Sequence, residues 1–406
     1  MKNNISRKED EINYCTSCQL CSAICPVDAI EIKLDIEGFY KPFIDDKKCI
    51  NCGKCISVCN KYDNSIIMSN EHKKVYAAKS KDKNILLNST SGGIGTHLAE
   101  QLIKEGYKII GVTYNYKSDI AENIIIEKTE DLYKIQGSKY IQSYSEKIYK
   151  EIFINLKDEK YAVFGLPCHI YGIDRHLKKI NKRENFILID LFCHGCPSLN
   201  LWTKYLNFIK QKYNLSEIKK IEFRSKKKGW HEYVISINYS ENKGFISKIN
   251  TKDIFFKLFF SDKFLNKSCY ECKLRSTLNY TDIRLGDYWG AEYDLDTEGV
   301  SAVVLVTENG KEIFEKLKNE IKVKESNFND VIKVQSYGKN YKLNEKEREN
   351  ILKSLNENEN FEIFLKEYEK TLSNEEKIKY ILKSVFYLLP QKIRLRMKKY
   401  YHNKIR

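Results

Sequence analysis

The chain has 406 residues, of which 42% are hydrophobic and 31% charged, and it contains only five prolines. With a mean hydropathy of −0.53, this composition excludes low-complexity disorder and predicts two or three globular domains. No apolar run approaches the length of a membrane span. The first residues, MKNNISRKEDEINYC, have no apolar signal segment, so we expect a cytoplasmic protein whose thirteen cysteines stay reduced.

Lys and Arg exceed Asp and Glu by 15. No nucleic-acid-binding motif accompanies the scattered lysines, so we expect no nucleic-acid partner. Thirteen reduced thiols point instead to metal or redox chemistry.

Two cysteine runs with the same spacing stand near the start of the chain. Three cysteines at intervals of three wrap the backbone around one cubane, and the fourth points toward a second site. We therefore predict two [4Fe–4S] clusters, one held by Cys15, Cys18, Cys21 and Cys59 and the other by Cys49, Cys52, Cys55 and Cys25.

A zinc module is the alternative, but one tetrahedral site has no place for the third cysteine of each run. The region resembles bacterial two-cluster ferredoxins, with short strands expected at DAIEIK and NSIIMS. One departure is Asn60, which follows Cys59 where the first run has proline.

From about Val75 the pattern changes to alternating apolar strands and amphipathic helices. The stretch NSTSGGIGTHLAEQLIKEG, from Asn88 to Gly106, predicts a Ser/Gly-rich loop that opens a helix, and the strand YKIIGVTY follows. A helix N-terminus suits the phosphates of a dinucleotide. The same pattern also fits a plain loop with a good helix cap.

Five further cysteines follow in the middle of the chain. KYAVFGLPCHIYGIDRHLKK predicts a strand, a turn with Cys168 and a helix, and NFILIDLFCHGCPS repeats the strand and turn at Cys193. Ligands gather at strand ends in α/β sheets. Together with the CxxC pair Cys269 and Cys272 these thiols could bind a third [4Fe–4S] cluster, although each alone also fits a buried core cysteine. Cys196 is left over.

Seven motifs in order, SGGIGTH, GLPCHI, LFCHGCPS, FRSKKKGW, CYECKLR, DIRLGDYWG and GVSAVVL, resemble the coenzyme F(420) hydrogenase/dehydrogenase beta-subunit family. The resemblance covers about 75–325 and implies a flavin-binding α/β body with FAD beside the third cluster. It assigns that cluster to Cys168, Cys193, Cys269 and Cys272, and flavin contacts to Ser91, Gly92, Gly93 and Thr96. Asp287, in LGDYWG, could contact the flavin or the substrate, or could equally well cap a turn. Departures from the usual family motifs fall at Leu166, His169 and Cys196.

The resemblance implies an oxidoreductase. Reduced ferredoxin or flavodoxin would dock on a basic surface near residues 1–66, and electrons would pass through the clusters to FAD and on to an unidentified organic substrate. Some bacterial relatives are associated with surface-polysaccharide genes. His169 or His194 could supply a proton, or could be polar residues hydrogen-bonded beside a cluster. The alternative is an electron-relay subunit without a substrate of its own.

We therefore expect an α+β and α/β protein with a ferredoxin-like domain (1–70), a flavoprotein body in two parts (71–155 and 156–330) and a charged helical tail (331–406). The end of the tail mixes Leu, Phe and Tyr with basic residues, and Pro390 should divide it into two short helices. This end could touch a membrane surface, pack on the body or meet a partner, which could be a second copy of the chain.

Overall fold

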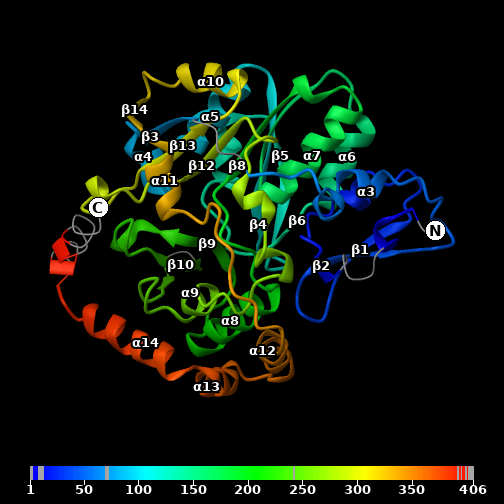
Figure 1. Ribbon diagram of the computed structural model, residues 1–406. Coiled ribbons are helices and arrows are strands. Elements are labelled where there is room, and N and C mark those ends of the chain that lie inside the picture. Colours follow the sequence, from blue (N-terminus) through cyan, green and yellow to red (C-terminus); the bar gives the residue numbers. More distant parts are fainter. Residues whose placement is uncertain are drawn as a thin grey trace.

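A computed structural model describes residues 3–7, 13–68, 73–240, 243–390, 393, 394, 396, 397 and 400 (Figure 1). The ferredoxin-like module comes first in the chain. It contains α2 (Leu20–Ala23), α3 (Lys54–Val58) and an antiparallel pair, β1 (Ile30–Leu34) and β2 (Tyr40–Ile44).

The strand expected at DAIEIK is confirmed as β1, whereas the strand expected at NSIIMS is wrong. Residues 64–68 form no strand. The partner of β1 is β2, which lies before the second cysteine run and needs only a short turn to pair antiparallel with β1.

A nine-stranded mixed sheet forms the centre of the body, in the order β14-β3-β13-β12-β8-β7-β4-β5-β6. Strands β4, β7, β8 and β12 are parallel neighbours, and β14, β3 and β13 extend the sheet in antiparallel fashion. Both expected parts of the body contribute strands to this one sheet. The strands are β3 (Lys74–Ser80), β4 (Tyr107–Asn115), β5 (Ile120–Ile126), β6 (Ser143–Tyr144), β7 (Lys160–Phe164), β8 (Phe186–Leu191), β12 (Ile283–Asp287), β13 (Ser301–Leu305) and β14 (Ile321–Ser326).

Helices cover both faces of this sheet because its central strands are apolar on both sides. Ala162 of β7 faces a core that includes Leu98 and Phe314, while its neighbours Tyr161 and Val163 face a second core. The helices next to the sheet are α4 (Lys83–Asn88), α5 (Ile94–Lys104), α6 (Glu146–Asn155), α7 (Pro167–Lys179), α10 (Glu308–Glu315) and α11 (Phe328–Val334).

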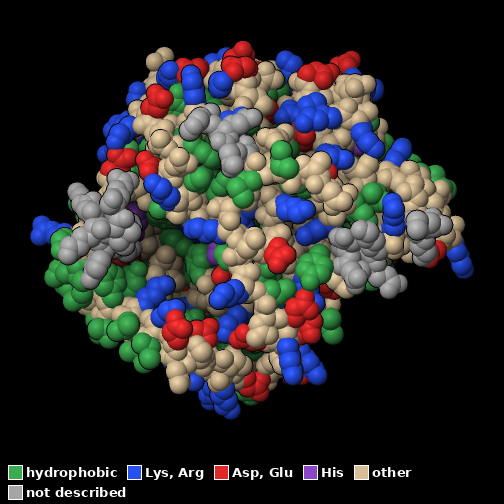
Figure 2. Space-filling model, viewed as in Figure 1, with side chains coloured by type: hydrophobic (Ala, Val, Ile, Leu, Met, Phe, Trp, Pro, Cys, Tyr) green, Lys and Arg blue, Asp and Glu red, His purple; other side chains and the backbone are tan. Residues whose placement is uncertain are grey.

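A second layer carries a three-stranded antiparallel sheet and an aromatic core around Trp202, Phe223 and Phe255. Its elements are α8 (Leu199–Lys212), β9 (Ile218–Ser225), β10 (Val234–Tyr239), β11 (Lys243–Ile246) and α9 (Ile254–Phe259). Short 3-10 helices lie at Ile5–Arg7, Asn60–Tyr62, Thr129–Lys134, Arg183–Asn185, Lys226–Lys228, Lys267–Cys269, Lys273–Ser276 and Ala291–Tyr293. Between α11 and β10 the molecular surface is deeply hollowed (Figure 2).

The expected helical tail is confirmed as α12 (Glu345–Glu357), α13 (Phe361–Thr371) and α14 (Asn374–Phe386). Its first two helices add Leu352, Leu355 and Phe364 to the aromatic core. Helix α14 ends before Pro390, and most of the second short helix expected beyond this proline lies outside the described residues. Among the described residues, no helix combines the length and apolarity needed to cross a bilayer.

The ferredoxin-like module packs directly on α7. A Cβ at Gly172 of this helix would lie 2.4 Å from Leu20 Cδ1 and 3.1 Å from the Val58 carbonyl oxygen, so the missing side chain allows the close approach. On the same helix the Arg175 guanidinium binds Asp63 at 2.5 Å. The module therefore lies against the helix that begins at the Cys168 turn.

Candidate functional site

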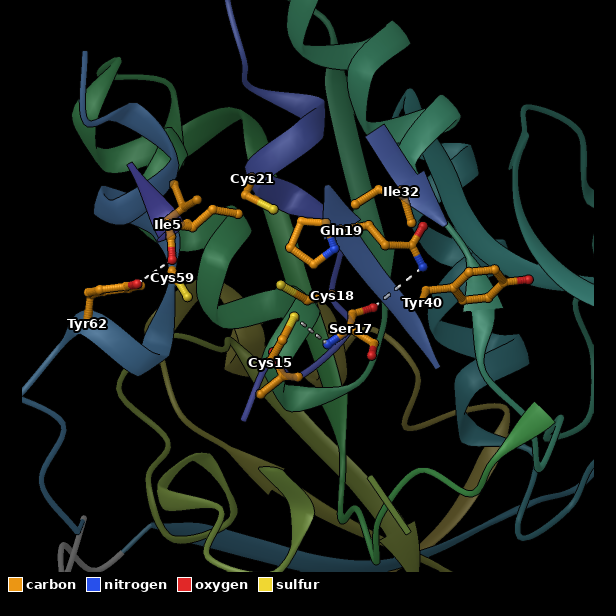
Figure 3. A pocket seen from close by; sticks show the side chains of 13 residues that line it. Ile5, Cys15, Ser17, Cys18, Gln19, Cys21, Ile32, Tyr40, Cys59 and Tyr62 are labelled. Carbon is orange, nitrogen blue, oxygen red and sulfur yellow. Dashed lines mark hydrogen bonds between the residues drawn. The ribbon is translucent and has the colours of Figure 1, made fainter. Parts of the chain in front are cut away.

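The first predicted cluster set surrounds one cavity of the module. Cys15, Cys18, Cys21 and Cys59 all line it, together with apolar side chains such as Ile32 and Val58 (Figure 3). Burial, together with the nearby Cys15, raises the pKa of the Cys18 thiol to about 11. Four thiols in an apolar pocket are poor sites for free thiolates but suit a cationic iron–sulfur core, so these residues fit the expected cluster.

The second predicted set lies nearer the surface. Burial raises the pKa of Cys55, and Cys52 and Cys49 add to this effect. These three thiols therefore lie near one another. Cys52 is exposed. Asn4 Nδ2 donates to Cys49 Sγ at 3.3 Å. Cys25 packs against the same apolar core as Cys55, and its place as the fourth ligand stays a prediction.

The four cysteines predicted for the third cluster line one cavity of the body. Cys168 is the second residue of α7 and Cys193 follows β8 by two residues, so adjacent parallel strands bring them together. Cys269 and Cys272 come from the 267–276 segment. Burial raises the pKa of Cys193 to about 12, with Cys269 and Cys272 adding to it.

The module cavity and the body cavity are neighbours. After burial, the largest cause of the raised pKa of Cys168 is Cys18 of the module. Thr16 and Ser17 line both cavities, and Tyr149 lies within the electrostatic range of both cysteines. The cluster set predicted for Cys15, Cys18, Cys21 and Cys59 thus adjoins the one predicted for the body.

Cys196, which the motif analysis left over, lines the body cavity as a fifth cysteine. Its backbone N–H donates to Cys269 Sγ at 3.4 Å. Burial raises the pKa of the Cys196 thiol, and Cys269 and Cys193 raise it further. A hydrogen bond to a ligating sulfur is one of the means by which proteins adjust a cluster's reduction potential.

Two buried arginines beside the body cavity were missed by the sequence reasoning. Arg275 lines the cavity and donates from Nη2 to the His194 carbonyl oxygen at 3.1 Å. Arg284 binds Asp190 at 2.9 and 2.5 Å, and both partners are fully buried. Arg275 lies three residues after Cys272 in the CYECKLR motif, which was the available signal for it.

The two candidate proton donors both have hydrogen-bond partners. His169 is buried, its Nδ1 lies 3.2 Å from the Tyr149 hydroxyl, and burial lowers its pKa to about 4. His169 is therefore uncharged at neutral pH. His194 lies between Asp262 Oδ1, at 2.7 Å from Nε2, and the Tyr341 hydroxyl, at 3.0 Å from Nδ1.

The Ser/Gly-rich loop does open a helix, but its polar groups bind the adjoining strand. Ser91 Oγ donates to the Val300 carbonyl oxygen at 2.8 Å, and the Gly92 N–H donates to Ser301 Oγ at 2.9 Å. A Cβ at Gly92 would lie 2.3 Å from the Ala78 carbonyl oxygen, so this glycine serves packing. Gly93, with φ 82°, begins α5, and Thr96 Oγ1 accepts from Gln136 Nε2 at 3.2 Å.

Asp287, the fifth predicted flavin contact, accepts hydrogen bonds from two residues of the FRSKKKGW motif. Arg224 Nη1 lies 2.5 Å from Oδ2, and Trp230 Nε1 lies 2.9 Å from Oδ1. Arg224 is buried, yet its Nε and Nη2 have no hydrogen-bond partner among the described residues. These two orphaned donors fit an anionic ligand better than the Ser91 loop does.

Two lysines are close to this arginine site or to the loop. Lys226 donates from Nζ to the carbonyl oxygens of Ser91, at 2.6 Å, and Leu86, at 2.7 Å. Burial lowers the pKa of Lys226 to about 7, although Asp287 opposes this effect, and burial also lowers the pKa of Lys139 to about 7. Both would gain charge beside an anion.

The fold and the cysteine cavities define an iron–sulfur protein of the oxidoreductase type. Sequence comparison gives the particular family. Residues 75–149 match the N-terminal part, and residues 158–331 the C-terminal part, of the family described as coenzyme F420 hydrogenase/dehydrogenase, beta subunit, and residues 14–62 match a 4Fe-4S dicluster domain. The chain belongs to this beta-subunit family, as its motifs predicted.

Its relatives include a subunit of F(420)H(2) dehydrogenase from Methanosarcina mazei, which is 25% identical over 77% of this chain and 85% of the relative. Coenzyme F420-dependent sulfite reductase from Methanocaldococcus jannaschii is 25% identical over 77% of this chain and 46% of the relative. A solved structure of the F420-reducing [NiFe] hydrogenase complex from Methanosarcina barkeri contains a chain with 22% identity and a TM-score of 0.46, over 64% of this chain and 84% of that one.

Proposed function

We propose that the protein is an electron-relay subunit of an oxidoreductase complex related to the F420-dependent enzymes. The observation that carries this proposal is that the two cysteine cavities are neighbours, since Thr16 and Ser17 line both of them. A module that served its own purpose would not need its cysteines beside those of the body.

Iron–sulfur clusters in these cages would supply one-electron carriers. In this proposal the positions of three residues define the order of the clusters along the path of the electrons. Cys52 brings the second set to the surface, Gly172 lets α7 approach the module, and Cys168 at the start of α7 joins the first set to the body cavity. The arrangement supports exchange with a partner at the Cys52 end and with a second redox group on the body side.

For that second group we propose FAD, held at the arginine site formed by Arg224, Trp230 and Asp287. The support is the pair of orphaned guanidinium nitrogens on a buried side chain. Bound flavin would supply conversion between one-electron and two-electron transfer. Arg224 would bind a phosphate or ring oxygen of the flavin. Asp287 orients the guanidinium group through its hydrogen bond with Arg224, and Trp230 holds the Asp287 carboxylate in place through a second hydrogen bond.

The arginine site also supports a second candidate function, that of an enzyme with an organic substrate of its own, including one of surface-polysaccharide metabolism. The surface hollow between α11 and β10 could admit such a substrate (Figure 2). Electrons would then come from ferredoxin or flavodoxin. Residues 1–66 carry ten acidic and nine basic side chains, so their net charge alone would not attract such a donor. The expected docking surface near these residues stays a prediction, and the exposed Cys52 end would offer the donor a route to the second cluster set.

Anaerobically purified protein separates the two functions. The relay predicts that reduced ferredoxin is oxidised only after a partner subunit is added, whereas an enzyme would turn over with a small organic acceptor alone. Flavin content tests the cofactor independently. We expect about one FAD per chain in the wild type, and Arg224→Lys should weaken flavin binding about tenfold because it removes the forked donor. Lys228→Met, in the same motif, serves as the control. Flavin retained equally by both variants would refute the arginine site.

A further inference from the structure

Helix α14 presents an aliphatic stripe to solvent. Ile378, Ile381, Leu382 and Val385 are 56%, 62%, 64% and 56% exposed, and their spacing of three and four places them along one helix face. Leu388, just beyond the helix, is 78% exposed. Hydrophobic side chains gather on the molecular surface over α14 (Figure 2). We call the four helical residues the outer stripe.

The opposite face of the same helix holds it to the body. Glu376 binds Lys263 Nζ at 2.9 Å, and Tyr380 lies under Lys257 Nζ, 5.8 Å from the ring centroid. At the end of the helix Tyr387 is 9% exposed, and its carbonyl oxygen accepts from Lys252 Nζ at 3.3 Å. The helix is thus anchored by its polar and aromatic side, with its aliphatic side turned outward.

This orientation is the reverse of that in an ordinary surface helix, where the aliphatic face is buried. A Ser373–Glu376 capping box stabilises the start of α14, so the outer stripe lies on a helix with a defined N-terminus. Packing of the tail on the protein's own body, one of the three options from the sequence, therefore does not account for the outer stripe.

Charge indicates what covers the stripe. Lys377 and Lys379 lie on either side of it along the helix surface, and Lys379 also pairs with Glu375 at 2.7 Å. The sequence that follows, residues 391–406, contains seven Lys and Arg residues and no Asp or Glu. One of the seven, Arg394, is buried and pairs with Glu232 of the body, so the charge available to a membrane comes from the other six. An aliphatic stripe bordered by lysines and joined to a polybasic segment is typical of helices that lie in the interface of an anionic bilayer.

We propose that α14 binds the surface of anionic membranes, with the outer stripe in the headgroup and acyl boundary and the basic residues of 391–406 other than Arg394 attracted to the negative lipids. This would hold the chain at a bilayer without a membrane span. The proposal does not depend on the clusters or on the flavin site.

Cosedimentation of the full chain with lipid vesicles tests it. We expect binding to vesicles of phosphatidylcholine with phosphatidylglycerol, and much weaker binding to phosphatidylcholine alone. The double variant Ile381→Glu, Leu382→Glu should bind the anionic vesicles at least about tenfold more weakly, because it puts charge into the apolar boundary. Ile154→Glu, at a 69% exposed position of α6, is the matched control and should bind as the wild type does.

Charge gives a second arm. Lys398→Glu, Lys399→Glu should weaken anionic binding, and added salt should do the same. Sedimentation velocity without lipid tests the competing occupant, a second copy of the chain. Dimers that Ile381→Glu, Leu382→Glu abolishes, combined with no vesicle binding, would overturn the proposal. Vesicle binding that is indifferent to both sets of substitutions would overturn it as well. Unchanged circular dichroism and iron content show that each variant is folded.

Discussion

The cysteine cavities and the Ser/Gly-rich loop were both predicted from short motifs, yet they differ in what their polar groups do. The thiols of Cys18 and Cys168 line neighbouring cavities, and Cys18 raises the pKa of Cys168. The polar groups of Ser91 and Gly92 instead form hydrogen bonds with Val300 and with Ser301 at the start of β13. Soft ligands at fixed spacing have few other uses inside a protein, whereas a glycine before a helix can serve packing as well as ligand binding.

Loss of a body thiol should give the largest effect. Cys168→Ser removes one of the four predicted ligands, so we expect iron to fall from about twelve to about eight atoms per chain. Cys196→Ser is the matched control and should keep about twelve. Iron and acid-labile sulfide analysis measures both. If Cys196→Ser loses iron and Cys168→Ser does not, the fifth cysteine is the ligand and the assignment fails.

Gly92→Ala tests whether the Ser/Gly-rich loop serves packing. The added methyl group would lie against backbone atoms, the Ala78 carbonyl oxygen and, at 2.6 Å, the Ser301 nitrogen, so we expect a loss of stability of about 3 kcal/mol. Gly95→Ala, three residues on, makes contacts of 3.7 Å or longer and should be neutral or slightly stabilising. Thermal unfolding compares them. A Gly92→Ala protein with wild-type stability but no flavin would restore the loop as a ligand site.

Gly172→Ala tests whether the close packing of α7 on the ferredoxin-like module is needed for electron transfer to the body. Its methyl group would meet Leu20 Cδ1, which belongs to a side chain that can rotate away, and the Val58 carbonyl oxygen, which belongs to the backbone and can shift less easily. We expect a cost of about 1–2 kcal/mol and slower electron transfer from the module clusters to the body cluster. Rapid-mixing spectroscopy of the reduced protein measures the rate. A variant that is less stable but transfers electrons at the wild-type rate would show that the packing of α7 on the module does not determine the distance between the two cavities.

A pH-dependent effect concerns the buried amine of Lys139 near the Ser/Gly-rich loop. Its pKa of about 7 in the folded state lies below the ordinary lysine value, so the folded protein loses this proton earlier than the unfolded chain. The cost of burying the charge is full below about pH 7 and disappears as the pH rises toward about 10. Lys139→Met should therefore raise the melting temperature near pH 6 and leave it unchanged near pH 10. An equal gain at both pH values would contradict this.

The sequence predicted much of the site because its signals are local. The runs at Cys15 and Cys49, and the strand ends at Cys168 and Cys193, carry their chemistry within a few residues. That the cavities of Cys18 and Cys168 are neighbours could not be predicted, because it depends on how α7 packs on the module. The same holds for the outward face of α14, since an amphipathic pattern does not say which side the body takes.

Electron paramagnetic resonance of the fully reduced protein tests the central claim, that the first module cluster and the body cluster are neighbours. Subtracting the spectrum of Cys168→Ser from that of the wild type leaves the contribution of the body cluster. Neighbouring paramagnetic clusters interact, so we predict a split and broadened difference spectrum. A simple, unsplit difference signal, as from an isolated cluster, would contradict the account.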